Sequence, residues 1–165
     1  MLAGTAGAKA FAIFSGVGSA SDIANREAMV ESGVPNVFAG TGSPTWGNPD
    51  YPWLIGSTLA PYSLEAKAFA DYLAEENPTA KVAMLVQDDD FGKAYEEALN
   101  LAIEGTEITV VEVATYLAGA GDVGSPVTSM AASGADGFFN GATLLRCTNA
   151  LETAKAAGWQ TITFC

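Results

Sequence analysis

The 165-residue chain contains no histidine. Histidine is the commonest general base and the commonest metal ligand, so its absence excludes Ser-His-Asp and Cys-His hydrolases within this chain. The only two cysteines, Cys147 and Cys165, match no metal-binding or redox spacing. We expect Cys147 to be a plain core residue on the apolar face of a helix. The sequence leaves open whether the two cysteines form a disulfide.

Positive charge is also scarce. Seven Lys and Arg residues stand against nineteen Asp and Glu residues, which gives a net charge of −12. A chain this acidic repels nucleic acid and anionic membrane surfaces. No apolar run reaches the ~20 residues needed to span a bilayer. Residues 1–8 lack the charged start and long apolar stretch of a signal peptide, so for an exported protein we expect the signal sequence to lie outside this chain.

The rest of the composition fits a packed globular protein of one domain, or of one lobe with part of another, because 49% of residues are hydrophobic and 16% are charged. Apolar runs alternate with helical spacings. Strands are expected at residues 10–14, 36–39, 53–57, 82–86, 108–113, 137–140 and 161–164. Helices are expected at 21–32 and 127–133, and along three apolar stripes: Ala66, Phe69, Ala70 and Leu73; Tyr95, Ala98, Leu99 and Ala102; and Leu144, Cys147, Leu151 and Ala154. This alternation predicts an α/β fold with right-handed crossovers and a mostly parallel sheet, and a break near residues 58–61 indicates a crossing between two lobes.

A turn rich in glycine and serine, residues 16–21, follows the first expected strand. It resembles the dinucleotide motif G-x-G-x-x-G, but Ser21 replaces the third glycine. No acidic residue stands ~20 positions further on, so nucleotide binding is disfavoured. Two interpretations remain. One is a tight turn in which a serine caps the helix, and the other is a helix N-terminus that binds a carboxylate or phosphate.

The loop after the next expected strand contains Thr41, Gly42, Ser43 and Trp46. Glycine lets the backbone approach a ligand, and the hydroxyl groups can donate hydrogen bonds to a carboxylate. Trp46 could form the wall of a pocket. An ordinary polar connection explains the same residues equally well.

An acidic run, Asp88, Asp89 and Asp90, follows the expected strand 82–86, at the edge where open α/β sheets bind ligands. Three carboxylates could hold a metal ion or a phosphoryl group, but the Lys and Thr residues of a phosphotransfer site do not accompany them. The favoured interpretation is that Asp90 caps the next helix, while Phe91 reaches into a cleft. At the end of the expected strand 137–140, Thr143 fits a helix cap and a ligand contact equally well.

The order and spacing of these segments resemble the type I periplasmic solute-binding proteins of ABC importers, in the branched-chain amino-acid and amide family. The resemblance runs from about residue 10 to residue 165. The matching pieces are Ala12-Ile13-Phe14 with Gly16-Val17-Gly18-Ser19, Gly33-Val34-Pro35 with Thr41-Gly42-Ser43, Asn48-Pro49 with Tyr51-Pro52-Trp53, Lys81-Val82-Ala83 with Asp89-Asp90-Phe91-Gly92, and Ser133-Gly134-Ala135-Asp136 with Phe138-Phe139.

The resemblance implies two Rossmann-like lobes, each a parallel sheet between layers of helices, that close on a ligand. It implies that this fold is incomplete here. Residues 1–58 would form part of lobe one, 59–61 a hinge crossing, and 62–165 most of lobe two. The lobe-one part would then expose apolar surface, because its sheet lacks some of its usual neighbours.

The resemblance also implies where a ligand binds. In relatives, the serine turn and the next loop hold the α-amino and α-carboxylate groups of the ligand. Gly42 stands where relatives often place a hydroxyl residue, so Thr41 or Ser43 would substitute. Phe91 would pack on the ligand, and Thr143 stands near another contact. The predicted ligand-binding residues are Gly18, Ser19, Ser21, Thr41, Gly42, Ser43, Trp46, Phe91 and Thr143.

We therefore expect a periplasmic or cell-surface substrate-binding component of an ABC importer, which binds an amino acid, an amide or a related small carboxylate. Its expected partner is the membrane permease, and we expect no catalysis, cofactor, metal or nucleic acid, and no membrane insertion of this chain. One alternative is the ligand-sensing domain of a receptor with the same fold. The other is a nucleotide- or metal-dependent α/β enzyme that uses Asp88, Asp89 and Asp90.

Overall fold

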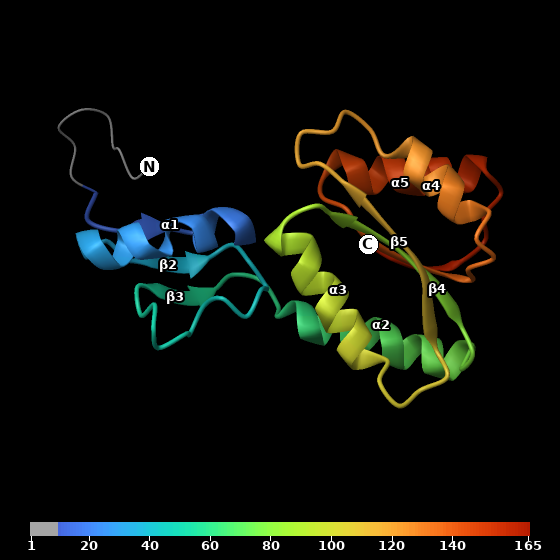
Figure 1. Cartoon of the computed structure of the whole chain (residues 1–165), viewed down its shortest axis with the longest axis horizontal. Coiled ribbons are helices and arrows are strands. Elements are labelled where there is room, and N and C mark those ends of the chain that lie inside the picture. Colours follow the sequence, from blue (N-terminus) through green and yellow to red (C-terminus); the bar gives the residue numbers. More distant parts are fainter. Residues whose placement is uncertain (1–9) are drawn as a thin grey trace. The chain divides into compact units, whose positions relative to one another are not determined.

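The computed structural model describes residues 10–165, which form two compact units, one ending at Tyr62 and the other beginning at Ser63 (Figure 1). The first unit contains β1 (Ile13–Phe14), α1 (Ser19–Ser32), β2 (Asn36–Ala39) and β3 (Leu54–Ser57). The second contains α2 (Tyr62–Glu76), β4 (Lys81–Gln87), α3 (Asp90–Ala102), β5 (Thr109–Tyr116), α4 (Gly124–Ala131), β6 (Gly137–Gly141), α5 (Leu145–Ala156) and β7 (Ile162–Phe164). No helix in this described part of the chain is long and apolar enough to cross a membrane.

The first unit is a parallel sheet, in the order β1-β2-β3, with one helix against it. Asn36 of β2 is 1% exposed and donates to Asp22 of α1, so α1 covers this face of the sheet. The apolar side chains of Phe14, Phe38 and Ile55 remain 73%, 52% and 49% exposed. The rings of Phe14 and Phe38 contact each other edge to face, with centroids 5.7 Å apart. The apolar surface expected on this part of the chain is therefore present.

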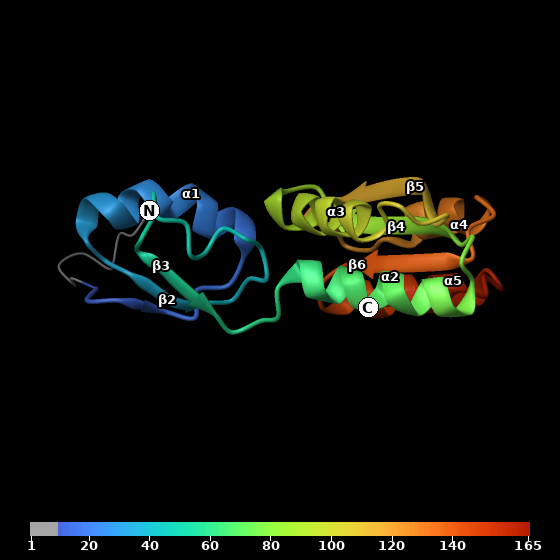
Figure 2. The same ribbon diagram turned by 90° about the horizontal axis from the view of Figure 1, so that it is seen from below.

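The second unit is a four-stranded parallel sheet, in the order β5-β4-β6-β7, between two layers of helices. Figures 1 and 2 show α4 and α5 on one side of this sheet and α2 and α3 on the other. Residues 82–86 of β4 are fully buried, as the continuous apolar run predicts. Phe138 packs toward α4 and α5, whereas Phe139 contacts Phe69 of α2 and Tyr95 of α3. The prediction of a three-layer α/β fold with parallel strands is confirmed.

The connections of the second unit reverse direction between β4 and β6. From β4 the chain runs through α3 to β5 at one edge, and from β5 it returns through α4 to β6 on the other side of β4. Right-handed crossovers that run in opposite directions along a sheet place their helices on opposite faces. The helix α3 follows β4 on one face and α5 follows β6 on the other, so the two helices move apart from the carboxyl ends of these neighbouring strands. Such a switch point leaves a crevice in which open α/β sheets bind ligands.

Several predicted ends are wrong by a few residues. β1 has only two residues rather than five, because residues 10–12 pair with no neighbouring strand. β5 continues to Tyr116, since it pairs with β4 along its whole length up to Gln87. α4 begins at Gly124, three residues before the predicted start.

The stripe predicted for α5 is partly wrong. Leu144 precedes the helix and is 84% exposed, and Leu151 is 39% exposed, while the buried positions are Ala150 and Ala154, of which only Ala154 belongs to the predicted stripe. Cys147 is half-buried and forms a disulfide with Cys165, so it is not a plain core residue. The two Cα atoms lie 6.5 Å apart, because α5 begins shortly after β6 and β7 then pairs alongside β6. Only this tertiary pairing brings the two sulfur atoms together.

Candidate functional site

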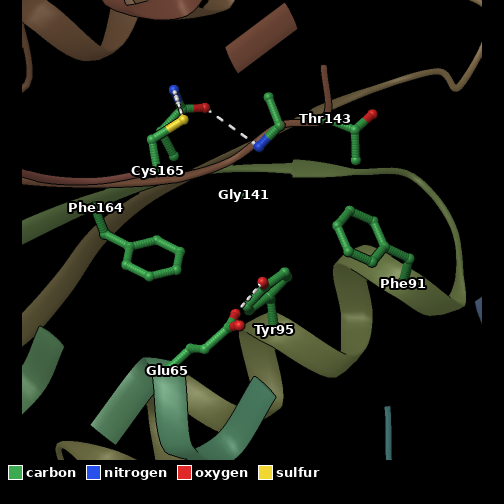
Figure 3. Close-up of a pocket in the computed structure, with 9 residues that line it drawn as sticks. Glu65, Phe91, Tyr95, Gly141, Thr143, Phe164 and Cys165 are labelled. Atoms are coloured by element: carbon green, nitrogen blue, oxygen red, sulfur yellow. Dashed lines mark hydrogen bonds between the residues drawn. The ribbon is translucent and has the colours of Figure 1, made fainter. Parts of the chain in front are cut away.

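The second unit has a pocket of about 360 Å³ at the switch point between β4 and β6 (Figure 3). Its lining comes from the first turn of α2, the first two turns of α3, the end of β6 with the turn after it, and the end of β7. The lining residues are Glu65, Phe91, Tyr95, Asn140, Gly141, Ala142, Thr143, Phe164 and Cys165. Two predicted ligand-binding residues, Phe91 and Thr143, therefore line one pocket, although they are far apart in the sequence.

The start of α3 places Phe91 at the pocket. Asp89 caps this helix, because its carboxylate accepts hydrogen bonds from the backbone N–H groups of Phe91 (2.9 Å) and Gly92 (3.3 Å). The prediction that Asp90 is the cap is wrong by one residue, since Asp90 already belongs to the first turn. Within the described residues, no group of three His, Cys, Asp or Glu side chains is placed to hold a metal ion. The acidic run thus gains a structural explanation as a cap and a favourable charge at the helix N-terminus.

Gly92 allows α3 to begin close against β4, since a Cβ atom here would overlap the backbone carbonyl of Gln87. We expect Gly92→Ala to lower the free energy of unfolding of the second unit by about 1–3 kcal/mol, because the helix must shift away from the strand. Urea unfolding measures this change. Gly119→Ala is the matched control, since a Cβ at Gly119 meets no atom within 4 Å. Equal stability of the two variants would contradict this explanation of Gly92.

The turn after β6 is held in place by two buried polar groups. The Asn140 side chain is 1% exposed; its Oδ1 accepts from the backbone N–H of Ala142 (3.2 Å) and its Nδ2 donates to the carbonyl of Cys147 (3.2 Å). The N–H of Thr143 donates to the hydroxyl of Tyr116 (3.1 Å). The cap of α5 is Leu144, without a side-chain hydrogen bond. Of the two interpretations of Thr143, the helix cap is therefore wrong.

Two residues that the sequence analysis did not single out form one wall of the pocket. The Tyr95 hydroxyl donates to Oε2 of Glu65 over 2.5 Å, and this bond joins α3 to α2. The apolar stripe of this helix predicted that Tyr95 is a core residue, and the structure adds the hydrogen bond from its hydroxyl to Glu65. Glu65 has no motif around it. The available signal was its position one residue before the buried stripe of α2, which places it near the sheet.

In the first unit, three predicted residues contact one another. The hydroxyl groups of Ser19 and Thr41 lie 2.7 Å apart, and the N–H of Ser43 donates to the Thr41 hydroxyl over 3.0 Å. Each residue is at most 3% exposed. Gly18 occupies the N-cap position of α1, and no side chain accepts a hydrogen bond from the first turn of this helix. The interpretation in which a serine caps this helix is wrong, because no side chain caps α1, which begins two residues before the expected start, and the Ser21 hydroxyl donates back to the carbonyl of Gly18 (2.9 Å).

Gly42 and Trp46 lie in the same loop of the first unit. A Cβ atom at Gly42 would overlap the carbonyl of Ala60 and the ring of Tyr62, so glycine lets residues 60–62 pack against the loop. Trp46 is half-buried, and its indole Nε1 has no hydrogen-bond partner among the described residues. The predicted site residues therefore fall into two groups, one in each unit.

The first unit also buries one carboxyl group. Asp22 is 3% exposed; its Oδ1 accepts from Nδ2 of Asn36 over 2.9 Å, whereas its Oδ2 has no partner among residues 10–165. Burial raises the pKa of Asp22 to about 6, and the hydrogen bond from Asn36 opposes this shift only in part. Oδ1 of Asn36 in turn accepts from the N–H of Gly16 (3.3 Å). Sequence analysis missed this group, because a single Asp in a first helical turn is usually exposed.

Comparison with known proteins gives a consistent result. The profile of a family described as periplasmic binding protein matches residues 5–165. No curated protein is similar enough to be matched. A substrate-binding periplasmic protein from Ralstonia solanacearum has a similar structure, with a TM-score of 0.81 and 22% identity over 93% of this chain and 43% of that one.

Two further solved structures share the fold. A branched-chain amino-acid ABC transporter protein from Thermus thermophilus with bound valine has a TM-score of 0.77 and 20% identity, over 92% of this chain and 39% of that one. An extracellular ligand-binding receptor from Rhodopseudomonas palustris HaA2 has a TM-score of 0.77 and 16% identity, over 93% of this chain and 42% of that one. The chain thus spans less than half the length of these structures, and at such low identity the likeness concerns the fold.

Proposed function

Because the chain belongs to the periplasmic binding protein family, we propose that it forms part of the extracytoplasmic substrate-binding component of an ABC importer. The ligand is an amino acid, an amide or a related small carboxylate. The observation that carries the proposal is the pocket at the β4/β6 switch point, which Phe91 and Thr143 both line. Its described lining offers aromatic rings, a hydroxyl and one carboxylate, a set suited to holding a solute.

In this proposal the two units are parts of the two lobes. The first unit is part of lobe one and contributes the network of Ser19, Thr41 and Ser43, the second unit is most of lobe two, and residues 59–61 are the hinge crossing. Ligand binding closes the lobes by hinge bending, and the closed form docks on the membrane permease.

The disulfide supports the extracytoplasmic location. Cys147 and Cys165 are bonded, and disulfides persist in the periplasm and at cell surfaces but are rare in the reducing cytosol. A ligand-sensing receptor domain is the second candidate, because one solved structure of this fold is described as an extracellular ligand-binding receptor.

The test is a thermal-shift panel of amino acids, amides and small carboxylates, run on the full-length protein that carries this chain and on the chain alone. A ligand that binds only the native state adds about 2.7 kcal/mol of stability at a hundredfold its dissociation constant. We expect one compound class to stabilise the full-length protein, and a weaker response from the chain alone. A flat panel, combined with stabilisation by nucleotide or divalent metal, would overturn the proposal and favour the enzyme alternative.

A further inference from the structure

The disulfide of the second unit lies at the wall of the pocket. Cys165 is one of the lining residues, and Cys147 belongs to the first turn of α5. Figure 3 shows Cys165 on the same side of the pocket as Gly141 and Thr143. The bond therefore joins the end of β7 to the start of α5, and the turn 141–143, which leads into α5, forms part of the same wall.

One buried side chain connects this disulfide with the turn. The carboxamide of Asn140, a residue that is 1% exposed, donates from Nδ2 to the carbonyl of Cys147 over 3.2 Å and more weakly to the Sγ atom of Cys165 over 3.6 Å. Its Oδ1 accepts from the N–H of Ala142 over 3.2 Å. A carboxamide has two N–H donors and one oxygen in a fixed plane. Because its donors are directed to the two cysteines, the positions of the cysteines fix the orientation of the oxygen that holds Ala142.

The second anchor of the turn does not involve the cysteines. The N–H of Thr143 donates to the hydroxyl of Tyr116 over 3.1 Å. Tyr116 ends β5, and β5 and β7 are the opposite edges of the sheet. Loss of the disulfide should therefore loosen the turn at Ala142, and the N–H of Thr143 serves as an internal reference.

We propose that Asn140 is a positioning residue through which the disulfide acts on the pocket: the bonded cysteines hold the Asn140 amide, and this amide holds the turn 141–143 at the pocket wall. A dithiol that reduces the bond passes two electrons and two protons to Cys147 and Cys165, which become thiols, and is itself oxidised to a disulfide. The buried amide then loses the fixed positions of its acceptors, so its hold on the turn weakens. The consequence for solute affinity rests on the proposed function, whereas the change in the turn does not.

The experiment measures backbone amide hydrogen exchange at single residues by NMR, on the full-length protein that carries this chain, before and after treatment with dithiothreitol. We expect the ratio of the Ala142 exchange rate to the Thr143 exchange rate to rise about tenfold on reduction, the change that corresponds to one lost hydrogen bond. Cys147→Ser/Cys165→Ser should show the higher ratio from the start and should not respond to dithiothreitol.

Met130→Ala separates positioning from stability. The Met130 side chain is fully buried in the core beneath α4 and is not one of the residues that line the pocket. Its truncation lowers the stability of the second unit without touching the turn. A loss of overall stability speeds the exchange of both amides together, so Met130→Ala should leave the ratio unchanged.

A double-mutant cycle tests whether the effect passes through Asn140. Asn140→Leu replaces the carboxamide by an apolar side chain of similar size, and we expect it to raise the ratio about tenfold by itself. Reduction of this variant should add no further rise, because the connection is already removed. If the two rises add instead, the disulfide acts on the turn without Asn140, and the inference is overturned. Asn140→Ser takes the place of Asn140→Leu if the latter does not fold.

The outcomes separate this inference from the proposed function. An exchange ratio that is the same in oxidised and reduced protein would overturn the positioning role of Asn140, whatever the panel of solutes shows. If the ratio rises as expected, any compound that the panel identifies should bind more weakly to the reduced protein. If the ratio rises and no compound of the panel binds, the positioning role stands and the proposed function falls.

Discussion

Breaking the Cys147–Cys165 disulfide is expected to lower the free energy of unfolding of the second unit by about 3 kcal/mol. The bond closes a short loop, with a sequence separation of 18, and a loop of this length restricts the unfolded chain by about that amount. It also anchors β7, an edge strand of three residues whose Phe164 ring stacks on Phe139 with centroids 4.5 Å apart. Denaturant unfolding with and without dithiothreitol measures the effect.

The double variant Cys147→Ser/Cys165→Ser provides the control. It should unfold at the lower midpoint of the reduced protein and should not respond to dithiothreitol. Since Phe164 and Cys165 both line the pocket, solute binding should weaken together with stability. An unfolding midpoint that is the same in oxidised and reduced protein would show that β7 needs no covalent anchor.

The first unit is expected to lose about 3 kcal/mol of stability as the pH rises from about 4 to about 7. The pKa of Asp22 is about 6 in the folded protein, against the usual 3.8 of an aspartate side chain, and each pKa unit corresponds to about 1.4 kcal/mol. Because the folded pKa is raised, the folded state holds the proton between these values. The contribution is fully present below pH 3.8 and is lost as the pH rises through 6.

The measurement is urea unfolding at half-unit pH steps, followed by the fluorescence of Trp46 and Trp53, both in the first unit. Asp22→Asn should remove this part of the pH dependence, because an amide does not titrate. Asp50→Asn, at an exposed position of the same unit, should leave it unchanged. A pH profile that is the same in Asp22→Asn and in the unmodified protein would mean that Asp22 ionises as easily when folded as when unfolded.

The fold followed from the sequence wherever the pattern was long. The buried run at residues 82–86 and the stripe of α2 leave little alternative to a strand buried on both faces and an amphipathic helix. Element ends were less reliable. The predicted caps of α1 and α3 were misplaced, because Asp89 and Asp90 are equally suitable caps by type, and because a glycine can precede a helix without any side-chain signal.

The candidate site was predicted in part, because two of its residues directly follow strands that the sequence indicates clearly. Phe91 and Thr143 each follow a buried parallel strand, and the carboxyl ends of neighbouring strands lie at one edge of the sheet. Glu65 comes from a helix that precedes the sheet, and Phe164 from its edge strand, so no local spacing connects them with the site. The buried state of Asp22 likewise depends on Asn36 of another element.

The sequence by itself determined the α/β class, the parallel strands and the exclusion of histidine chemistry, because these depend on composition and on local periodicity. The tertiary structure alone decided which residues meet: the order β5-β4-β6-β7, which creates the switch point; the pairing of Glu65 with Tyr95; and the disulfide between Cys147 and Cys165. The physical reason is that each of these contacts joins elements that are distant in the sequence. Their meeting is set by crossover handedness and by burial of both faces of the sheet, which no single segment encodes.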